Sequence, residues 1–292
     1  MNKTTQFPKT YKYAEAYLTM RCNLKCSYCL NTFDKNFSRV KVEELDGKKW
    51  IDSLNKIEFP SNIPITLGGG EPSLHKDFIF IINNLRKETH IDILTNMMWG
   101  KEKIKKFINE VNPERLRRDA PYASIRVSYH PEQMDINKVV ENAKMLQDAG
   151  FYVGIWAVLF PSPDQLSKIN MAQFICRNKG IDFRLKEFVG EYNGVTYGTY
   201  KYLDSTSYKF QKKAECKTTE LLIGPRGDVY KCHRDLYAYE NSLGNISDLN
   251  FEIKDTFKNC PKFGECHPCD VKVKTDSKQN LGHTSVEIKV ID

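Results

Sequence analysis

Short apolar runs alternate with longer amphipathic segments through the first two thirds of the chain. The apolar runs predict strands, and the segments between them repeat apolar residues every three or four positions, which predicts helices. The predicted strands cover residues 14–19, 63–67, 91–94, 123–129, 151–160 and 181–187. The predicted helices cover residues 43–56, 77–87, 102–111, 136–149 and 165–179. Alternating units of this spacing predict an α/β fold whose six parallel strands curl into a partial (β/α)6, TIM-like barrel.

The pattern changes at about Phe188. Residues 188–215 are rich in Gly, Tyr, Lys and Ser and have no clear period, as in a linker or a substrate-facing loop. Further on, residues 221–223 and 229–231 flank a Gly-Pro-Arg-Gly turn and predict a β-hairpin. We therefore expect two parts: a barrel over residues 1–187, and a linker with a small cysteine-rich extension over residues 188–292.

Composition excludes several classes of protein. No apolar stretch of about 18 residues occurs and the N-terminus has no signal-peptide core, so we expect a cytoplasmic protein without a membrane span. The net charge is +7, and part of it lies on one predicted helix at residues 101–106. That cluster is either a solvated face or a surface for an acidic electron donor or substrate. No nucleic-acid-binding motif accompanies the charge, which argues against nucleic acid as a partner.

Nine cysteines are more than packing requires in such a chain, and clustered cysteines there indicate metal. Cys176 stands alone in a predicted helix, where it is expected to be a core residue. Cys22, Cys26 and Cys29 follow the first predicted strand directly, with C-x3-C-x2-C spacing. Three thiolates can hold an iron–sulfur cluster with one iron left open, whereas a structural zinc site requires four ligands.

The segment from Leu18 to Cys29 (LTMRCNLKCSYC) resembles the signature of the radical S-adenosylmethionine (SAM) superfamily, in which the position of Tyr28 is commonly aromatic. The resemblance implies a [4Fe–4S] cluster whose open iron chelates SAM. An electron from a flavodoxin- or ferredoxin-type donor then splits SAM into methionine and a 5′-deoxyadenosyl radical. That radical takes a hydrogen atom from the substrate, while the protein supplies position and excludes water.

A glycine run after the second strand, followed by Glu71, resembles the GGE motif of the same superfamily. Its glycines are Gly68, Gly69 and Gly70. The resemblance implies that this segment contacts the amino group of SAM, with Glu71 as an acceptor. It further implies polar contacts to SAM from Ser128, at the end of the fourth strand, and from Asn96, at the end of the third. His130 either contacts SAM or substrate or is structural, and it stays open whether Arg184 or Lys186 reaches the site.

The second cysteine group begins with Cys216 and Cys232, whose spacing around Gly227 resembles the opening of the SPASM and twitch extensions of the superfamily. A hairpin would bring these two thiols together, and a later Cys-x2-Cys turn, Cys266 and Cys269, would close the set. Four thiolates suit one auxiliary iron–sulfur cluster, a [4Fe–4S] cluster by ligand count, with zinc as the alternative.

A full SPASM domain has seven cysteines and this region has five, so one auxiliary cluster is expected and one cysteine is left over. We expect the spare to be Cys260. Its roles are an alternative ligand, a structural thiol or a hydrogen-atom donor. As a donor it predicts that Cys260→Ala still cleaves SAM but forms no net product.

The leading expectation is a radical SAM enzyme of oxidoreductase or isomerase type that modifies a peptide by epimerisation, crosslinking or oxidation. The alternative is the same chemistry on a sugar, nucleoside or other polar small molecule, by dehydrogenation or epimerisation. The cluster loop begins at residue 22, which leaves no room for an N-terminal leader-binding domain and weakens the peptide hypothesis. The tyrosines within residues 188–215 suit stacking on a ring. A non-catalytic metal-binding protein is the third possibility.

Overall fold

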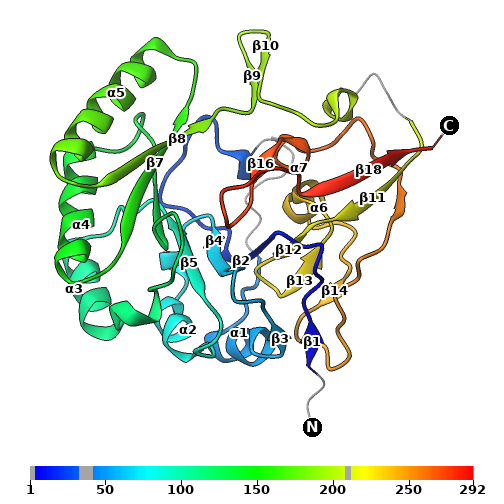
Figure 1. Cartoon of the computed structure of the whole chain (residues 1–292), viewed down its shortest axis with the longest axis horizontal. Coiled ribbons are helices and arrows are strands. Elements are labelled where there is room, and N and C mark those ends of the chain that lie inside the picture. Colours follow the sequence, from blue (N-terminus) through cyan, green and yellow to red (C-terminus); the bar gives the residue numbers. More distant parts are fainter. Residues whose placement is uncertain (1–3, 33–41, 208–211, 292) are drawn as a thin grey trace.

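A nine-stranded sheet runs through the computed structural model, which describes residues 4–32, 42–207 and 212–291. Its strand order is β14-β13-β12-β2-β4-β5-β6-β7-β8 (Figure 1). Six neighbouring strands are parallel: β2 (Tyr13–Thr19), β4 (Ile65–Gly69), β5 (Ile91–Thr95), β6 (Ile125–Tyr129), β7 (Val153–Leu159) and β8 (Asp182–Glu187). They coincide with the six apolar runs, so the expected parallel α/β sheet is confirmed.

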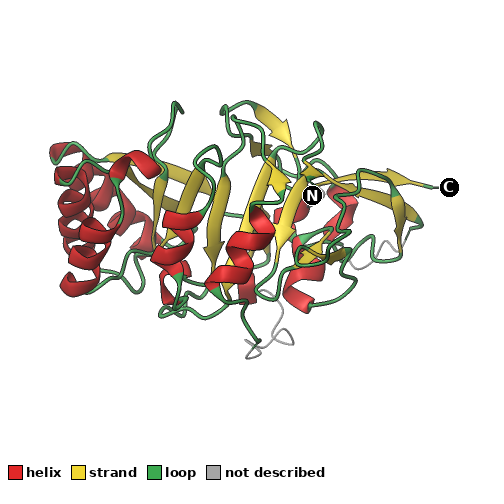
Figure 2. Cartoon of the chain, turned by 90° about the horizontal axis from the view of Figure 1, so that it is seen from below, coloured by secondary structure: helices red, strands yellow, loops and turns green. Residues whose placement is uncertain are grey.

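Five helices connect these strands and pack along one face of the sheet (Figure 2). They are α1 (Gly47–Leu54), α2 (Phe78–Asn84), α3 (Lys101–Glu110), α4 (Ile136–Asp148) and α5 (Pro163–Asn178). The side chain of Asp135 caps α4 by accepting a hydrogen bond from the Asn137 backbone N–H, which explains where that helix begins. Cys176 is fully buried in α5, as a core residue should be. No helix in the described ranges is long and apolar enough to cross a membrane.

The opposite face of the sheet is polar, which is unusual for parallel strands. Glu15, Thr66 and Asp92 lie side by side in register on β2, β4 and β5. A Cβ atom at Gly68 would lie 2.2 Å from Glu15 Oε1, so the carboxylate occupies space that only glycine leaves free. Arg126 on β6 approaches Asp92 at 3.6 Å. This buried charged lining is a surface on which polar ligands can be held.

The last third of the chain adds to the same sheet. β12 (Glu220–Ile223) and β13 (Asp228–Tyr230) form the expected hairpin, and β12 pairs in parallel with β2, opposite β4. A separate antiparallel sheet contains β15 (Lys258–Cys260), β11 (Ala214–Thr218) and β18 (Val286–Val290) in that order. Two short helices belong to this part of the chain: α6 (His233–Ala238) follows β13, and α7 (Pro268–Val271) follows β15 (Figure 1).

The remaining strands are short. They are β1 (Thr5–Gln6), β3 (Ile57–Glu58), β9 (Gly190–Tyr192), β10 (Val195–Tyr197), β14 (Gly244–Asn245), β16 (Lys274–Thr275) and β17 (Leu281–His283). β9 and β10 form a small antiparallel hairpin within the stretch expected to be a linker or loop. This hairpin follows β8 directly and projects away from the sheet (Figure 1).

Candidate functional site

The first three cysteines lie in the loop after β2, at the carboxyl edge of the parallel strands. Burial raises the pKa of the Cys26 thiol to about 12, and the neighbouring Cys29, Glu132 and Cys22 add to the effect. The side-chain amide of Asn96, at the end of β5, lies 3.8 Å from Cys22 Sγ. A thiol with a raised pKa, such as that of Cys26, is poorly ionised on its own, and a bound cationic metal would favour its thiolate form. Their chemistry therefore fits an iron–sulfur cluster.

The cysteine loop is held from outside by the segment after β6. Glu132 accepts hydrogen bonds from the Ser27 backbone N–H at 2.6 Å and from its hydroxyl at 2.8 Å. The side-chain oxygen of Gln133 accepts one from the Lys25 backbone N–H at 2.8 Å. These contacts fix the backbone on both sides of Cys26, so the loop keeps its shape independently of a ligand.

Tyr28 and His130 support the same loop. The Tyr28 hydroxyl lies 3.1 Å from His130 Nδ1, and its ring stacks on Phe160 with centroids 4.8 Å apart. Burial lowers the pKa of His130 to about 4, so its imidazole is neutral at physiological pH. Tyr28 belongs to the cysteine loop, and His130 lies against it. Their contacts with SAM stay predictions.

The glycine segment after β4 approaches the cysteine loop through its backbone. The Gly70 N–H donates to Thr19 O and the Glu71 N–H to Arg21 O, each at 2.8 Å. A Cβ atom at Gly70 would lie 2.3 Å from Arg21 O, so this close approach requires glycine. Gly69 has a φ of +118°, which likewise suits glycine alone.

Glu71 joins the ends of β4 and β5 through its side chain. Its carboxylate is fully buried and accepts hydrogen bonds from the Asn96 N–H at 2.7 Å and the Thr95 hydroxyl at 2.8 Å. The Trp99 indole at 3.3 Å and the Ser73 N–H at 3.2 Å complete the set. The expected contact of this carboxylate with the SAM amino group stays a prediction.

Asn96 and Ser128 lie at neighbouring strand ends. The Asn96 side chain also donates to Asn23 Oδ1 at 2.8 Å, which holds it against the cysteine loop. Ser128 is half-buried on the polar face of β6, in register with Trp156 of β7. Both positions are consistent with the expected polar contacts to SAM, which remain predictions.

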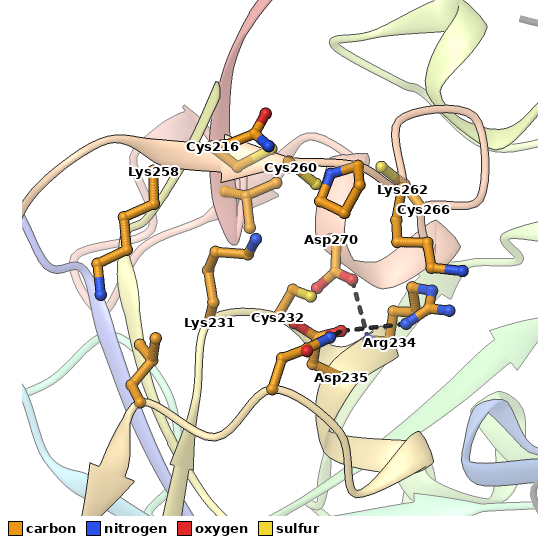
Figure 3. A pocket seen from close by; sticks show the side chains of 15 residues that line it. Cys216, Lys231, Cys232, Arg234, Asp235, Lys258, Cys260, Lys262, Cys266 and Asp270 are labelled. Carbon is orange, nitrogen blue, oxygen red and sulfur yellow. Dashed lines mark hydrogen bonds and ion pairs between the residues drawn. The ribbon is translucent and has the colours of Figure 1, made fainter. Parts of the chain in front are cut away.

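Four cysteines of the second group surround a cavity of about 200 Å³ (Figure 3). They are Cys216, Cys232, Cys260 and Cys266. Across residues 4–32, 42–207 and 212–291, no three His, Cys, Asp or Glu side chains converge closely enough to hold a single metal ion. The cavity instead has room for a larger group between the thiols, and its donor set is the one that iron–sulfur clusters use.

The register of the small sheet explains why Cys260 is in this set. β15 pairs with β11 so that Cys260 lies opposite Ala214, which places it on the same face as Cys216. The sequence analysis had instead left Cys260 as the spare thiol. Strand pairing across more than 40 residues of chain is not visible in cysteine spacing.

Cys269, expected to be the fourth ligand, does not line the cavity. Its neighbour Asp270 does, and the Asp270 carboxylate accepts hydrogen bonds from the His233 backbone N–H at 2.8 Å and from His233 Nδ1 at 2.7 Å. Successive helical residues point about 100° apart. With Asp270 toward the cavity, Cys269 lies toward Tyr237 and Tyr200, where its charge adds to the effect of burial in raising their pKa values. Cys260 therefore lines the cavity and Cys269 does not, while the ligand set of an auxiliary cluster stays a prediction.

Buried rings connect the two cysteine sites. His267 Nδ1 accepts from the Cys269 N–H at 3.1 Å, which leaves Nε2 to donate to Leu30 O at 3.2 Å, next to Cys29. Burial lowers the pKa of His267 to about 4, so the ring is neutral. Tyr237 packs edge-on against His267 with centroids 5.1 Å apart. These contacts link the segment that holds Cys269 to the loop that holds Cys29.

Comparison with known proteins identifies the chemistry of the first site. Residues 17–169 match the family model described as the radical SAM superfamily. The GTP 3′,8-cyclase of Nautilia profundicola is 26% identical over 211 residues, which is 68% of this chain and 63% of that protein. The same enzyme from Aliarcobacter butzleri is 23% identical over 192 residues, 64% of this chain and 58% of that protein. The chain thus spans less than two thirds of the length of these relatives.

Solved structures agree at the level of the fold. Native anSMEcpe with bound AdoMet and a peptide superposes with a TM-score of 0.53 at 16% identity, over 92% of each chain. The family match covers the strand before the cysteine loop, the glycine segment and the ends of β5 and β6. The chain therefore belongs to the radical SAM superfamily.

Proposed function

We propose that this protein holds a [4Fe–4S] cluster through Cys22, Cys26 and Cys29, binds SAM beside it, and removes a hydrogen atom from a substrate. The observation that carries the proposal is the placement of the three-cysteine loop beside the glycine segment at one edge of a parallel sheet. Members of the superfamily use such a cluster, SAM and an electron donor. When bound, cluster and SAM supply the 5′-deoxyadenosyl radical.

The residues of the chain would orient these groups. Glu132 and Gln133 fix the backbone of the cysteine loop, and the Glu71 carboxylate fixes the strand ends beside it. The glycine segment presents bare backbone to the methionine part of SAM. Asn96 and Ser128 offer polar atoms on the same side. The six strands would curl into the partial barrel expected from the sequence, with this site at its mouth.

We further propose that residues 188–292 form a twitch- or SPASM-like extension that holds one auxiliary iron–sulfur cluster. The four thiols around the cavity support it, and Lys231 lines the same cavity. Burial lowers the pKa of Lys231, yet the adjoining thiolates of Cys260, Cys232 and Cys216 outweigh it and leave that pKa raised. A lysine cation would therefore offset part of the cluster's negative charge. Zinc at these four thiols is the alternative, which the size of the cavity disfavours.

The substrate we favour is a polar small molecule, oxidised or epimerised at a C–H bond. The charged lining of the sheet supports this choice, since it suits a ligand with many polar groups. The GTP 3′,8-cyclases among its relatives act on such a molecule. A peptide is the second candidate, because the structural neighbour that matches 92% of each chain was solved with a peptide. A flavodoxin- or ferredoxin-type protein would supply the electron in either case.

The test is anaerobic purification followed by incubation with SAM and dithionite. The protein should be brown, contain about eight iron atoms per chain by ligand count, and form 5′-deoxyadenosine and methionine. Cys26→Ala should lose SAM cleavage, whereas Cys176→Ala, which removes a buried thiol on α5, should keep it. A colourless, zinc-loaded protein that leaves SAM intact would refute the proposal in favour of a non-catalytic metal-binding role.

A further inference from the structure

The two flanks of the first cysteine loop contact different parts of the chain. On the amino side the segment after β6 supplies the contacts, through the side chains of Glu132 and Gln133. On the carboxyl side, Leu30 O lies 3.2 Å from His267 Nε2, and His267 belongs to the extension. Leu30 directly follows Cys29, so the extension contacts the backbone beside the third thiol.

The His267 ring makes hydrogen bonds through both of its nitrogen atoms. Nδ1 accepts from the Cys269 N–H at 3.1 Å, which caps the first turn of α7. The proton of the neutral ring therefore lies on Nε2, the atom that donates to Leu30 O. One side chain thus begins helix α7 and also reaches the cysteine loop, so the helix and the loop are held at a fixed separation.

Packing keeps the ring in this place. His267 is buried, Tyr237 packs edge-on against it with centroids 5.1 Å apart, and His233 stacks on it with centroids 6.1 Å apart. His233 Nδ1 in turn lies 2.7 Å from the Asp270 carboxylate. Both packing rings belong to α6, which begins directly after Cys232, one of the cysteines around the cavity. The position of His267 therefore depends on both short helices beside the second cysteine group.

The contact at Leu30 bears on the surroundings of Cys29. Leu30 is partly buried, so its carbonyl would lose a protein donor, or turn toward water, if the ring were removed. Asn31, one residue further on, donates to Gly69 O at 3.1 Å and ties the same flank to the glycine segment. The reduction potential of an iron–sulfur cluster depends on its exposure to solvent and on hydrogen bonds near its ligands. A contact that holds this backbone can therefore change the properties of a cluster bound here.

We propose that His267 is a positioning residue of the first site, through which the extension holds the carboxyl flank of the cysteine loop and limits the access of water to Cys29. The inference rests on the proposed function in one respect, namely that Cys22, Cys26 and Cys29 hold a cluster. It adds a second role for the extension, since residues beside the second cysteine group would set the surroundings of the first.

Two substitutions separate the two hydrogen bonds of His267. His267→Asn places an oxygen close to the position of Nδ1, so it can still accept from the Cys269 N–H, but it is too short to reach Leu30 O. His267→Gln carries an amide nitrogen about as far out as Nε2, so it can still donate to Leu30 O. We therefore expect His267→Asn to release the loop and His267→Gln to keep it held.

The chain offers a matched control in His75, which is buried and bonded in the same pattern. His75 Nδ1 accepts from the Asp77 N–H at 3.2 Å, and His75 Nε2 lies 2.8 Å from Leu45 O. His75→Asn also removes one contact between a histidine and a carbonyl, but at a segment that leads into α1. It should lower the melting temperature about as much as His267→Asn does, without changing the cysteine loop.

Hydrogen–deuterium exchange of residues 22–32 in the anaerobically purified protein measures the loop directly. His267→Asn should speed the exchange of these amides about fivefold, which corresponds to the loss of one net hydrogen bond. His267→Gln and His75→Asn should exchange at the rate of the unchanged protein.

Redox titration followed by electron paramagnetic resonance gives a readout that a purely structural role would not move. The first cluster is identified as the one whose signal changes when SAM is added. Its midpoint potential should rise in His267→Asn, because water that reaches Cys29 stabilises the more negative, reduced cluster. The potential should be unchanged in His267→Gln and in His75→Asn.

Two results would overturn the inference: exchange and potential in His267→Asn equal to those of the unchanged protein, or changes of the same size in His75→Asn. Should His267→Asn fail to fold, Tyr237→Leu takes its place, since it removes the ring packed against His267. Unchanged exchange of residues 22–32 in Tyr237→Leu would then refute the role of His267, and faster exchange would support it.

The same measurements separate this inference from the proposed function. If the unchanged protein shows no cluster signal that responds to SAM, the proposed function fails. Hydrogen exchange needs no cluster, so it still decides whether His267 holds the loop. If the cluster signal responds to SAM but His267→Asn changes neither exchange nor potential, only the role of His267 is refuted.

Discussion

Replacing Glu220 by glutamine should destabilise the protein far more than its conservative nature suggests. Glu220 begins β12 and is fully buried, and it binds Lys274 Nζ at 2.9 Å and His283 Nε2 at 3.1 Å. Glu220→Gln keeps the shape but leaves the Lys274 ammonium, 17% exposed, without its counter-charge. Removing one partner of a buried ion pair costs about 3–5 kcal/mol. We expect Glu220→Gln to lower the free energy of unfolding by about 3 kcal/mol, the low end of this range, because the amide oxygen still accepts one hydrogen bond.

That loss corresponds to a fall in melting temperature of roughly 6–12 °C for a chain of this size class. Differential scanning calorimetry of the anaerobic holoenzyme measures it. The matched control is Asp164→Asn in the exposed pair with Lys168 on α5, at 2.8 Å, whose contribution should be below about 1 kcal/mol. Adding Lys274→Met to Glu220→Gln should recover most of the loss, because the stranded charge is then gone.

Acid titration gives an independent check. Burial favours the neutral form of Glu220, but Lys274 and His283 outweigh it and lower the pKa of the carboxyl group well below its usual range. Because its pKa is lowered in the folded state, the Glu220 carboxylate contributes its full stabilisation at any pH above the unfolded-state pKa of about 4.3. This contribution is lost progressively as pH falls from that value toward the folded-state pKa. The stability gap between the unchanged protein and Glu220→Gln should therefore be constant from pH 7 to 5 and shrink below about pH 4. If Glu220→Gln and Asp164→Asn lower the melting temperature equally at pH 7, the buried ion pair does not contribute more than the exposed one, and the prediction is wrong.

Two further outcomes are expected. Cys260→Ala should lower the iron content from about eight to about four atoms per chain, whereas Cys269→Ala should leave it at about eight; the reverse result in iron analysis would restore the assignment made from sequence. Gly68→Ala should destabilise the fold by about 1–3 kcal/mol in thermal unfolding, because the added methyl meets the Glu15 carboxylate at 2.2 Å; unchanged stability would show that the carboxylate moves freely.

The features that sequence revealed correctly are local ones. Each parallel strand is a short apolar run bounded by polar residues, so its place is set within the strand itself. The spacing of Cys22, Cys26 and Cys29 is likewise contained in eight residues, and a loop of that length brings the thiols together whatever the rest of the chain does. Gly70 belongs to this group as well, since a glycine run after a strand already indicates close backbone approach.

The features that sequence could not indicate depend on distant pairing. That Cys260 lies on the same face as Cys216 follows from the register of β15 against β11. The hydrogen bonds of Glu71 come from β5 and from Trp99, which the motif does not contain. Spacing within a motif says which residue types are present, but not which neighbours will occupy their polar atoms.

The parallel pairing of β12 with β2 has a consequence for dividing this protein. Glu220 to Ile223 pair with Tyr13 to Ala16, so a chain cut near residue 187 would expose the backbone of β2 along one side. An unpaired, apolar edge strand is a template for pairing with other chains, and the truncated core should aggregate. Natural or engineered exchange of the last third among related enzymes must therefore carry a replacement for β12.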